Sequence, residues 1–178
     1  GIFYSGISFL RRGYQMGRPT PSVSHMVIFT TSGEGYLATS ENEYILTEKS
    51  LIVVPAEHAC MFGVKDDDWK ILWFYMNPHI HWNSLIERGI SFSYTDLCER
   101  IGNSMEAYLS EFGSPGTTPG RAAELHAKLI AIYLDRALGI SEISDDQEMK
   151  NSLEKLWKSV RDNVEEKWTL EQLSSKLN

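Results

Sequence analysis

The stretch "WKILWFYM" at residues 69–76 carries large apolar side chains at almost every position. Successive side chains of a β-strand point to opposite faces of the sheet. One face of this strand therefore carries Trp69, Ile71, Trp73 and Tyr75. The other face is apolar too, except for a single lysine. A strand with two apolar faces has one face toward an interior and the other under a covering layer, so the stretch predicts a β-domain with a second layer outside it.

The chain upstream of this stretch has the same character. Segments rich in β-branched and aromatic residues are separated by turn residues at 32–35 ("SGEG"), 40–43 ("SENE") and 65–68 ("KDDD"). Several short strands at this spacing predict a sandwich or barrel over residues 1–78. The predicted strands are "HMVIFTT", "GYLATS", "EYILT", "SLIVVPA", "ACMFGV" and "WKILWFYM".

Apolar residues recur at helical spacing over residues 79–140, which we predict as a helical region. A first helix is expected over 79–88. Ser93 and Asp96 have the spacing of a capping box, which predicts the start of a second helix, and "GSPGTTPG" ends that helix.

A third helix is predicted over 121–138, and it carries two apolar stripes. The first consists of Leu125, Leu129 and Ile132. One stripe can pack on the strand domain, whereas the other either forms a dimer interface or lies under a further helix. The sequence leaves these two interpretations open. The second stripe consists of Ile130, Tyr133, Leu134, Ala137 and Leu138.

The end of the chain is predicted to be a separate piece. Residues 141–149 are acidic and lack large aromatic side chains, which is typical of a linker. Residues 150–178 contain two short amphipathic stretches, and Thr169 with Gln172 fits a capping box before the second. Helices this short cannot bury their stripes alone, so we expect them to open an all-helical module that continues beyond the sequence.

Composition narrows the function classes. The net charge of −7 argues against a nucleic-acid-binding surface over most of the chain. No apolar run approaches the length of a membrane span, so neither a membrane anchor nor a membrane partner is expected. Cys60 and Cys98 stand in apolar surroundings without CxxC spacing, which predicts two reduced, buried thiols in a cytoplasmic protein.

The order of parts resembles that of the AraC-type bacterial transcriptional regulators, and the resemblance covers nearly the whole chain. It rests on four segments in combination: "HMVIFTTSGEGYL", "YILTEKSLIVVPAEHACMF", "DWKILWFYMNPHIHW" and "LEKLWKSVRDNVEEKWTLEQLSSKLN". The resemblance implies a mainly β fold with helices: a cupin-like jelly roll that binds an effector, helices that pair two subunits, and the start of a DNA-binding helix-turn-helix domain. DNA would be bound only through the missing C-terminal part.

The resemblance also implies a ligand site, with departures from the family's arabinose-responsive member. Trp73 and Tyr75 keep its aromatic positions. Ser32, Ile71 and Cys60 stand where that member has a sugar-contacting arginine, a histidine and a ligand-facing tyrosine. The implied effector is therefore a sugar or related small molecule other than arabinose. Ser50 departs as well, because it replaces the usual glycine of a Gly-Asp turn.

The residues themselves allow two interpretations of this face. An aromatic platform of Trp73 and Tyr75 suits a sugar, because the apolar face of a pyranose packs on a ring while fixed polar groups hold its hydroxyls. His58, Cys60 and Phe62 would share a face of the neighbouring strand, where His58 could orient a hydroxyl. The alternative is plain sandwich core, in which the cavity is filled and the domain only dimerises.

A metal-dependent cupin enzyme is the rival class. Such a site needs about three ligands that converge from facing strands. His25 and His58 lie on predicted strands, but neither has a second histidine two residues on. His79 and His81 have that spacing on a predicted helix, where alternate residues point apart. With no nucleophile–base pair or phosphate-binding glycine loop in the sequence either, we expect no catalytic residue and no cofactor.

Overall fold

The computed structural model divides the chain into two compact units, residues 1–140 and 141–178. The predicted linker and the predicted start of the helix-turn-helix domain lie outside the described residues, apart from Arg161. No helix in the described part of the chain is both long and apolar enough to cross a membrane. The structure describes residues 1–18, 22–78, 80–112, 120–140 and 161.

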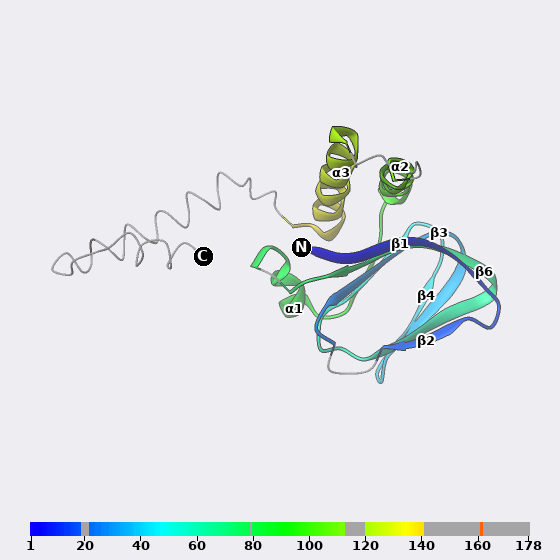
Figure 1. The fold of residues 1–178 in the computed structure, drawn as a ribbon. Coiled ribbons are helices and arrows are strands. Elements are labelled where there is room, and N and C mark those ends of the chain that lie inside the picture. Colours follow the sequence, from blue (N-terminus) through cyan, green and yellow to red (C-terminus); the bar gives the residue numbers. More distant parts are fainter. Residues whose placement is uncertain (19–21, 79, 113–119, 141–160, 162–178) are drawn as a thin grey trace. The chain divides into compact units, whose positions relative to one another are not determined.

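The first unit is built on a seven-stranded antiparallel sheet (Figure 1). The strand order is β1-β6-β3-β5-β7, while β2 pairs with β6 and β4 pairs with β3. The two long strands β3 and β6 pair along most of their length and hold the other strands together. The strands are β1 (Ile2–Arg11), β2 (Gln15–Arg18), β3 (His25–Ala38), β4 (Glu43–Leu46), β5 (Ser50–Val54), β6 (Cys60–Met76) and β7 (Ser91–Tyr94).

Two of the predicted turns are wrong. β3 runs without a break through 32–35, and β6 runs through 65–68. The register between the strands shifts at this point, so that both segments are absorbed as bulges within continuous strands. A salt bridge of 2.9 Å between Lys65 and Glu34 joins the two bulged segments. The predicted turn at 40–43 is confirmed, because it connects β3 to β4.

The helical region also contains a strand. Its elements are a 3₁₀ turn, η1 (Ile80–Trp82), followed by α1 (Ser84–Arg88), β7, α2 (Cys98–Ser110) and α3 (Arg121–Leu138). The third helix has the predicted bounds.

The predicted capping box at Ser93 is wrong. Ser93 lies in β7 opposite Leu51, because this segment extends the sheet by pairing with β5. The second helix starts later, at Cys98, where the Thr95 hydroxyl accepts the Leu97 N–H at 3.2 Å.

The sheet has a core on each face, as the sequence of β6 predicted. The inner core lies inside the barrel and includes Trp69 and Ile71 of β6. The outer core includes Leu72 and Phe74 of the same strand and lies under the helices. In Figure 1, α2 and α3 lie beside each other on one side of the barrel. Each fully buried large side chain stabilises the fold by about 1.5–3 kcal/mol, so both layers contribute substantially.

The two stripes of α3 have different environments. Ile130, Leu134 and Leu138 are buried in the outer core. The stripe of Leu125, Leu129 and Ile132 is 52%, 38% and 36% exposed, respectively. One stripe is therefore core, and the other is a surface stripe of the single chain.

Candidate functional site

The barrel encloses a cavity of about 210 Å³. It lies among β1, β2, β3 and β6, on the inner face of the sheet. Three of its lining residues, Ile71, Trp73 and Tyr75, were predicted from the alternation of β6. The full lining is Ser8, Leu10, Tyr14, Met16, Met26, Ile28, Phe62, Ile71, Trp73 and Tyr75.

Trp73 is held in place by β1. Its indole N–H donates a hydrogen bond of 2.9 Å to the Ser8 hydroxyl. Its ring packs edge-on against Tyr75, with 5.8 Å between the ring centroids. Gly6, which pairs with Trp73 in the sheet, leaves room for the ring, because a Cβ there would lie 2.6 Å from a ring carbon. The indole face is thus positioned at the cavity wall.

The lining carries few polar groups. The hydroxyls of Ser8, Tyr14 and Tyr75 are the polar side-chain groups besides the Trp73 N–H. Ser8 accepts that N–H and keeps its own O–H, so the hydroxyls of Ser8, Tyr14 and Tyr75 can each bond a ligand. The remaining lining side chains are aliphatic, thioether or phenyl groups. Such a cavity binds a small molecule with a largely apolar body and a few polar atoms.

A buried polar cluster lies just beyond one end of the cavity. Arg18 is directly opposite Cys60 in the pairing of β2 with β6, and both are buried. Burial raises the pKa of Cys60 and of Tyr75, which the positive charge of Arg18 only partly offsets, so both groups are uncharged at neutral pH. Burial lowers the pKa of His25, and the charge of Arg18 adds to this effect.

The structure separates the remaining predicted ligand residues. Cys60 is buried two residues before Phe62 of the lining, and it is free, as is Cys98. His58 lies outside the strands, with its Nδ1 atom 3.0 Å from the Ala56 carbonyl oxygen. Ser32 is exposed opposite Lys70, in the bulged part of β3. Neither His58 nor Ser32 lines the cavity.

Sequence reasoning missed the wall contributed by the first two strands. Ser8, Leu10, Tyr14 and Met16 all belong to residues before the first strand that was predicted in detail. A signal was present, because Ser8 and Leu10 alternate with neighbours on the opposite face of a strand. Arg18 gave no such signal, since an arginine beside a proline is typical of an exposed loop.

Two of the histidines, His25 and His81, each have one ring nitrogen that contacts another residue. The Nδ1 atom of His25 accepts the Ala56 N–H at 3.1 Å, and Nε2 of His81 lies 2.8 Å from Oδ1 of Asp135. Among the described residues, no group of three or more His, Cys, Asp and Glu side chains could hold a metal ion.

A larger hollow of about 410 Å³ lies between β3 and α2, on the outer side of the sheet. Its walls are charged, and opposite charges already pair across it. Nζ of Lys49 lies 2.8 Å from Oδ1 of Asp96, and Nζ of Lys70 lies 3.9 Å from Oε1 of Glu106. We therefore place the candidate site in the smaller barrel cavity, whose lining is mostly apolar with a few polar groups.

An antiparallel barrel that encloses a small cavity and carries helices on its outer face defines a cupin-like ligand-binding domain. The family model of the AraC-like ligand binding domain matches residues 9–173. The chain belongs to this family, and it is a ligand-sensing domain of the AraC type.

Among solved structures, apo ToxT (a single-residue variant) from Vibrio cholerae strain SCE256 has a similar fold, with a TM-score of 0.51 and 11% identity. The match covers 97% of this chain and 69% of that one. Wild-type ToxT from the same strain, bound to an unsaturated fatty acid, gives a TM-score of 0.44 at 10% identity; the match covers 99% of this chain and 69% of that one. A cupin superfamily protein from Desulfitobacterium hafniense DCB-2 gives 0.38 at 14% identity; the match covers 41% of this chain and 65% of that protein, slightly less than two thirds. No curated protein matches the chain.

Proposed function

We propose that the chain is the effector-sensing part of a bacterial transcription regulator and that its effector binds in the barrel cavity beside Trp73. The observation that carries the proposal is the two-sided arrangement of β6. Trp73 and Tyr75 line the cavity from one face of this strand. Leu72 and Phe74, between and beside them, pack in the outer core with the helices. A ligand that moves β6 therefore acts on both layers.

The connection from β6 to the helices supports this mechanism. The chain leaves β6 at Met76 and reaches Trp82, whose indole N–H donates to Oδ1 of Asp135 on α3 at 3.2 Å. Arg88 also donates to the Leu138 carbonyl oxygen at the end of α3. An effector shifts the population between two arrangements of barrel and helices by no more than its differential affinity for them.

The cavity limits the kind of effector. A sugar would pack its apolar face on Trp73 and take hydrogen bonds from Tyr14 and Tyr75. The aliphatic and thioether side chains of the lining favour a molecule with a larger apolar part than an unmodified sugar. A volume of about 210 Å³ suits a molecule of roughly one ring. The proposed effector is therefore a small, partly apolar molecule, and sugars are one class to test.

A thermal-shift screen of the 178-residue chain tests the proposal. The panel contains sugars, sugar acids, aromatic and aliphatic acids with their amides, and divalent metals with and without chelator. A ligand at a hundredfold over its Kd stabilises the fold by about 2.7 kcal/mol, which is readily visible. We expect a hit that quenches tryptophan fluorescence and is lost in Trp73→Ala, but kept in Phe3→Ala, an exposed aromatic residue of β1.

Three results would contradict the proposal. Ligand binding that is equally tight in Trp73→Ala and in the parent would place the effector elsewhere. Stabilisation by a metal, lost with chelator, would favour the cupin-enzyme alternative and direct attention to His25 and His58. If no compound stabilises the fold, a module that only dimerises becomes the better interpretation.

We also propose that the exposed stripe of α3 pairs two chains into a homodimer. Leu129 and Ile132 are apolar, surface-exposed and on the helix whose other stripe fixes it to the barrel. Leu129→Asp should shift sedimentation toward the monomer, because it would bury a charge in the interface. Glu124→Ala, an exposed change on the same helix, should leave sedimentation unaltered. An identical profile for both variants would place the interface elsewhere.

DNA recognition is the remaining part of the proposal. We assign it to a helix-turn-helix domain of which residues 150–178 would form the first part. On this assignment the 178-residue chain has no recognition helix. A sequence-selective mobility shift by this chain at physiological salt would contradict the assignment.

A further inference from the structure

Arg18 is a buried cation whose partners are all uncharged. Only 7% of it is exposed. Its guanidinium donates to carbonyl oxygens of the neighbouring loops and to one hydroxyl, and no ion pair among the described residues includes it. Residues 19–21, directly after it, are Pro-Thr-Pro and contain no acid. The acceptors are Ser22 Oγ (2.8 Å), the Ser24 carbonyl, the Val54 carbonyl (2.9 Å) and the Pro55 carbonyl (3.2 Å).

This arrangement is costly without a counter-ion. Removing a charged group from water costs several kcal/mol, and neutral oxygens return only part of it. One donor of the guanidinium, Nε, is buried and has no hydrogen-bond partner. The nearby Cys60 and Tyr75 do not supply a negative charge, because burial raises the pKa of both groups, and His25 is neutral because burial lowers its pKa. The cluster therefore has one formal positive charge and two unused donors, Nε of Arg18 and Nε2 of His25.

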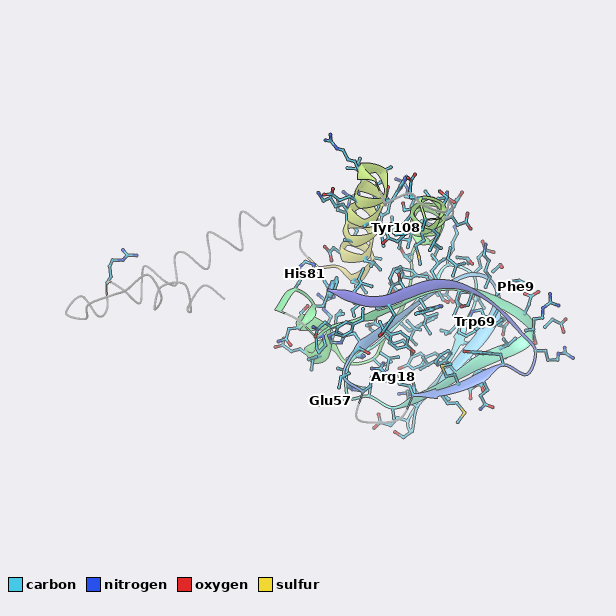
Figure 2. All side chains as sticks on the ribbon, in the orientation of Figure 1. Phe9, Arg18, Glu57, Trp69, His81 and Tyr108 are labelled. Atoms are coloured by element: carbon cyan, nitrogen blue, oxygen red, sulfur yellow. The ribbon has the colours of Figure 1, made fainter. Side chains whose placement is uncertain are left out.

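The position of Arg18 relates it to the cavity. In the pairing of β2 with β6, Met16 lies opposite Phe62, and both line the cavity. The next pair on the same face is Arg18 with Cys60, two residues further along. Two residues of strand span about 7 Å, the length of a few carbon–carbon bonds. Figure 2 shows Arg18 and Trp69 inside the ring of strands.

Tyr75 joins the two regions. It lines the cavity, and it is close enough to Arg18 for the positive charge to oppose the rise in the Tyr75 pKa that burial causes. Met26, another lining residue, follows two residues after Ser24, whose carbonyl oxygen accepts from Arg18. Arg18 is not itself a lining residue, but the lining residues Met16 and Phe62 belong to the two paired strands that also carry Arg18 and Cys60.

We propose that Arg18 binds an acidic group of the effector, so that the cavity takes a molecule with an apolar body and one carboxylate or similar acid. This inference rests on the proposed function, because it assumes that the barrel cavity is the effector site. The acid accepts the free Nε–H and supplies the missing counter-charge, while the apolar body lies against Trp73 and Ile28. Charge-assisted hydrogen bonds are about twice as strong as neutral ones, so the acid determines specificity.

The experiment compares acids with their own amides, which keep the shape and remove the charge. The probes are octanoic acid and 3-phenylpropanoic acid, each with its primary amide, at neutral pH. Affinities come from tryptophan quenching and thermal shift. In the parent chain we expect each acid to bind at least about tenfold tighter than its amide. Arg18→Met should remove this preference by weakening the binding of the acid far more than that of the amide, because only the acid forms a charge-assisted hydrogen bond with Arg18. Arg12→Met, an equal charge change at an exposed site, should keep it.

The outcomes separate the two ideas. If the parent chain binds acid and amide equally tightly, the cavity remains the effector site but the role of Arg18 is overturned. This comparison needs no variant, so it holds even if Arg18→Met fails to fold. If the folded Arg18→Met variant still prefers the acid to the amide, the role of Arg18 is overturned as well. If neither acid binds while a neutral compound of the screen binds in a Trp73-dependent manner, the proposed function stands and the role of Arg18 is wrong. If the binding of no compound depends on Trp73, both the role of Arg18 and the proposed effector site are wrong.

Discussion

Replacing Gly6 with alanine tests the packing that positions Trp73. A Cβ at residue 6 would lie 2.6 Å from Cζ2 and 2.8 Å from Cε2 of the Trp73 ring. Ordinary carbon–carbon contacts are about 3.5–4.0 Å, so the ring or the strand must move by roughly 1 Å. The hydrogen bond of 2.9 Å from Trp73 to Ser8 would be strained by the same movement.

The expected loss of stability follows from three contributions. Overpacking in a tight core costs about 1–3 kcal/mol. A weakened hydrogen bond costs up to about 1 kcal/mol. Alanine gains about 0.5–1 kcal/mol over glycine in the middle of a strand, which offsets part of this. The net effect of Gly6→Ala is a destabilisation on the order of 2 kcal/mol, measured as a lower urea midpoint with an unchanged slope.

Gly17→Ala is the matched control. Gly17 also lies in a strand, β2, but a Cβ there would meet nothing within 4 Å. This variant should be as stable as the parent or slightly more stable. A double variant of Gly6→Ala with Trp73→Leu should lose less than the sum of the two single changes, because the smaller side chain makes room. If Gly6→Ala and Gly17→Ala behaved alike, the position of the Trp73 ring under β1 would be refuted.

Two further predictions concern buried polar groups. Asp135→Ala should destabilise the fold by about 1–3 kcal/mol in urea unfolding, because it leaves the buried Trp82 N–H without its acceptor. The exposed control Glu124→Ala should change the free energy of unfolding by less than about 0.5 kcal/mol, and equal effects of the two variants would contradict this role of Asp135. Because burial lowers the pKa of His25, the unfolded chain takes up this proton first, so the stability due to neutral His25 is complete above about pH 6.5 and is lost as the pH falls below it. Thermal unfolding of His25→Asn should depend less on pH between about 7.5 and 5.5 than unfolding of the parent, and an unchanged pH dependence would assign the effect to another group.

The part of the cavity wall that belongs to β6 was predictable, because it depends on local alternation. Ile71, Trp73 and Tyr75 share a face in any strand that contains them. Whether that face lines a cavity depends on what lies opposite, and this is decided by pairing between distant segments. Gly6 pairs with Trp73 across more than sixty residues of chain, and no local pattern specifies that register.

The incorrect turn predictions have a related cause. Charged and small residues such as those at 65–68 favour turns when they are considered alone. Here the flanking segments both pair with β3, so the chain continues in the same direction and the extra residues form a bulge. Ser93 is a similar case, because strand pairing with Leu51 takes precedence over its capping preference.

Arg18 shows how a functional feature can conflict with local rules. Arg18 stands between Gly17 and Pro19, which predicts exposure, yet its side chain is buried with no ion-pair partner among the described residues. A chain selected only for stability would replace such a residue by an apolar one, since buried charges contribute little or negative stability. Departures of this kind are expected at binding sites, where the ligand completes the interaction. The cost of Arg18 in the free domain is then part of the affinity for an acidic effector, because binding relieves it.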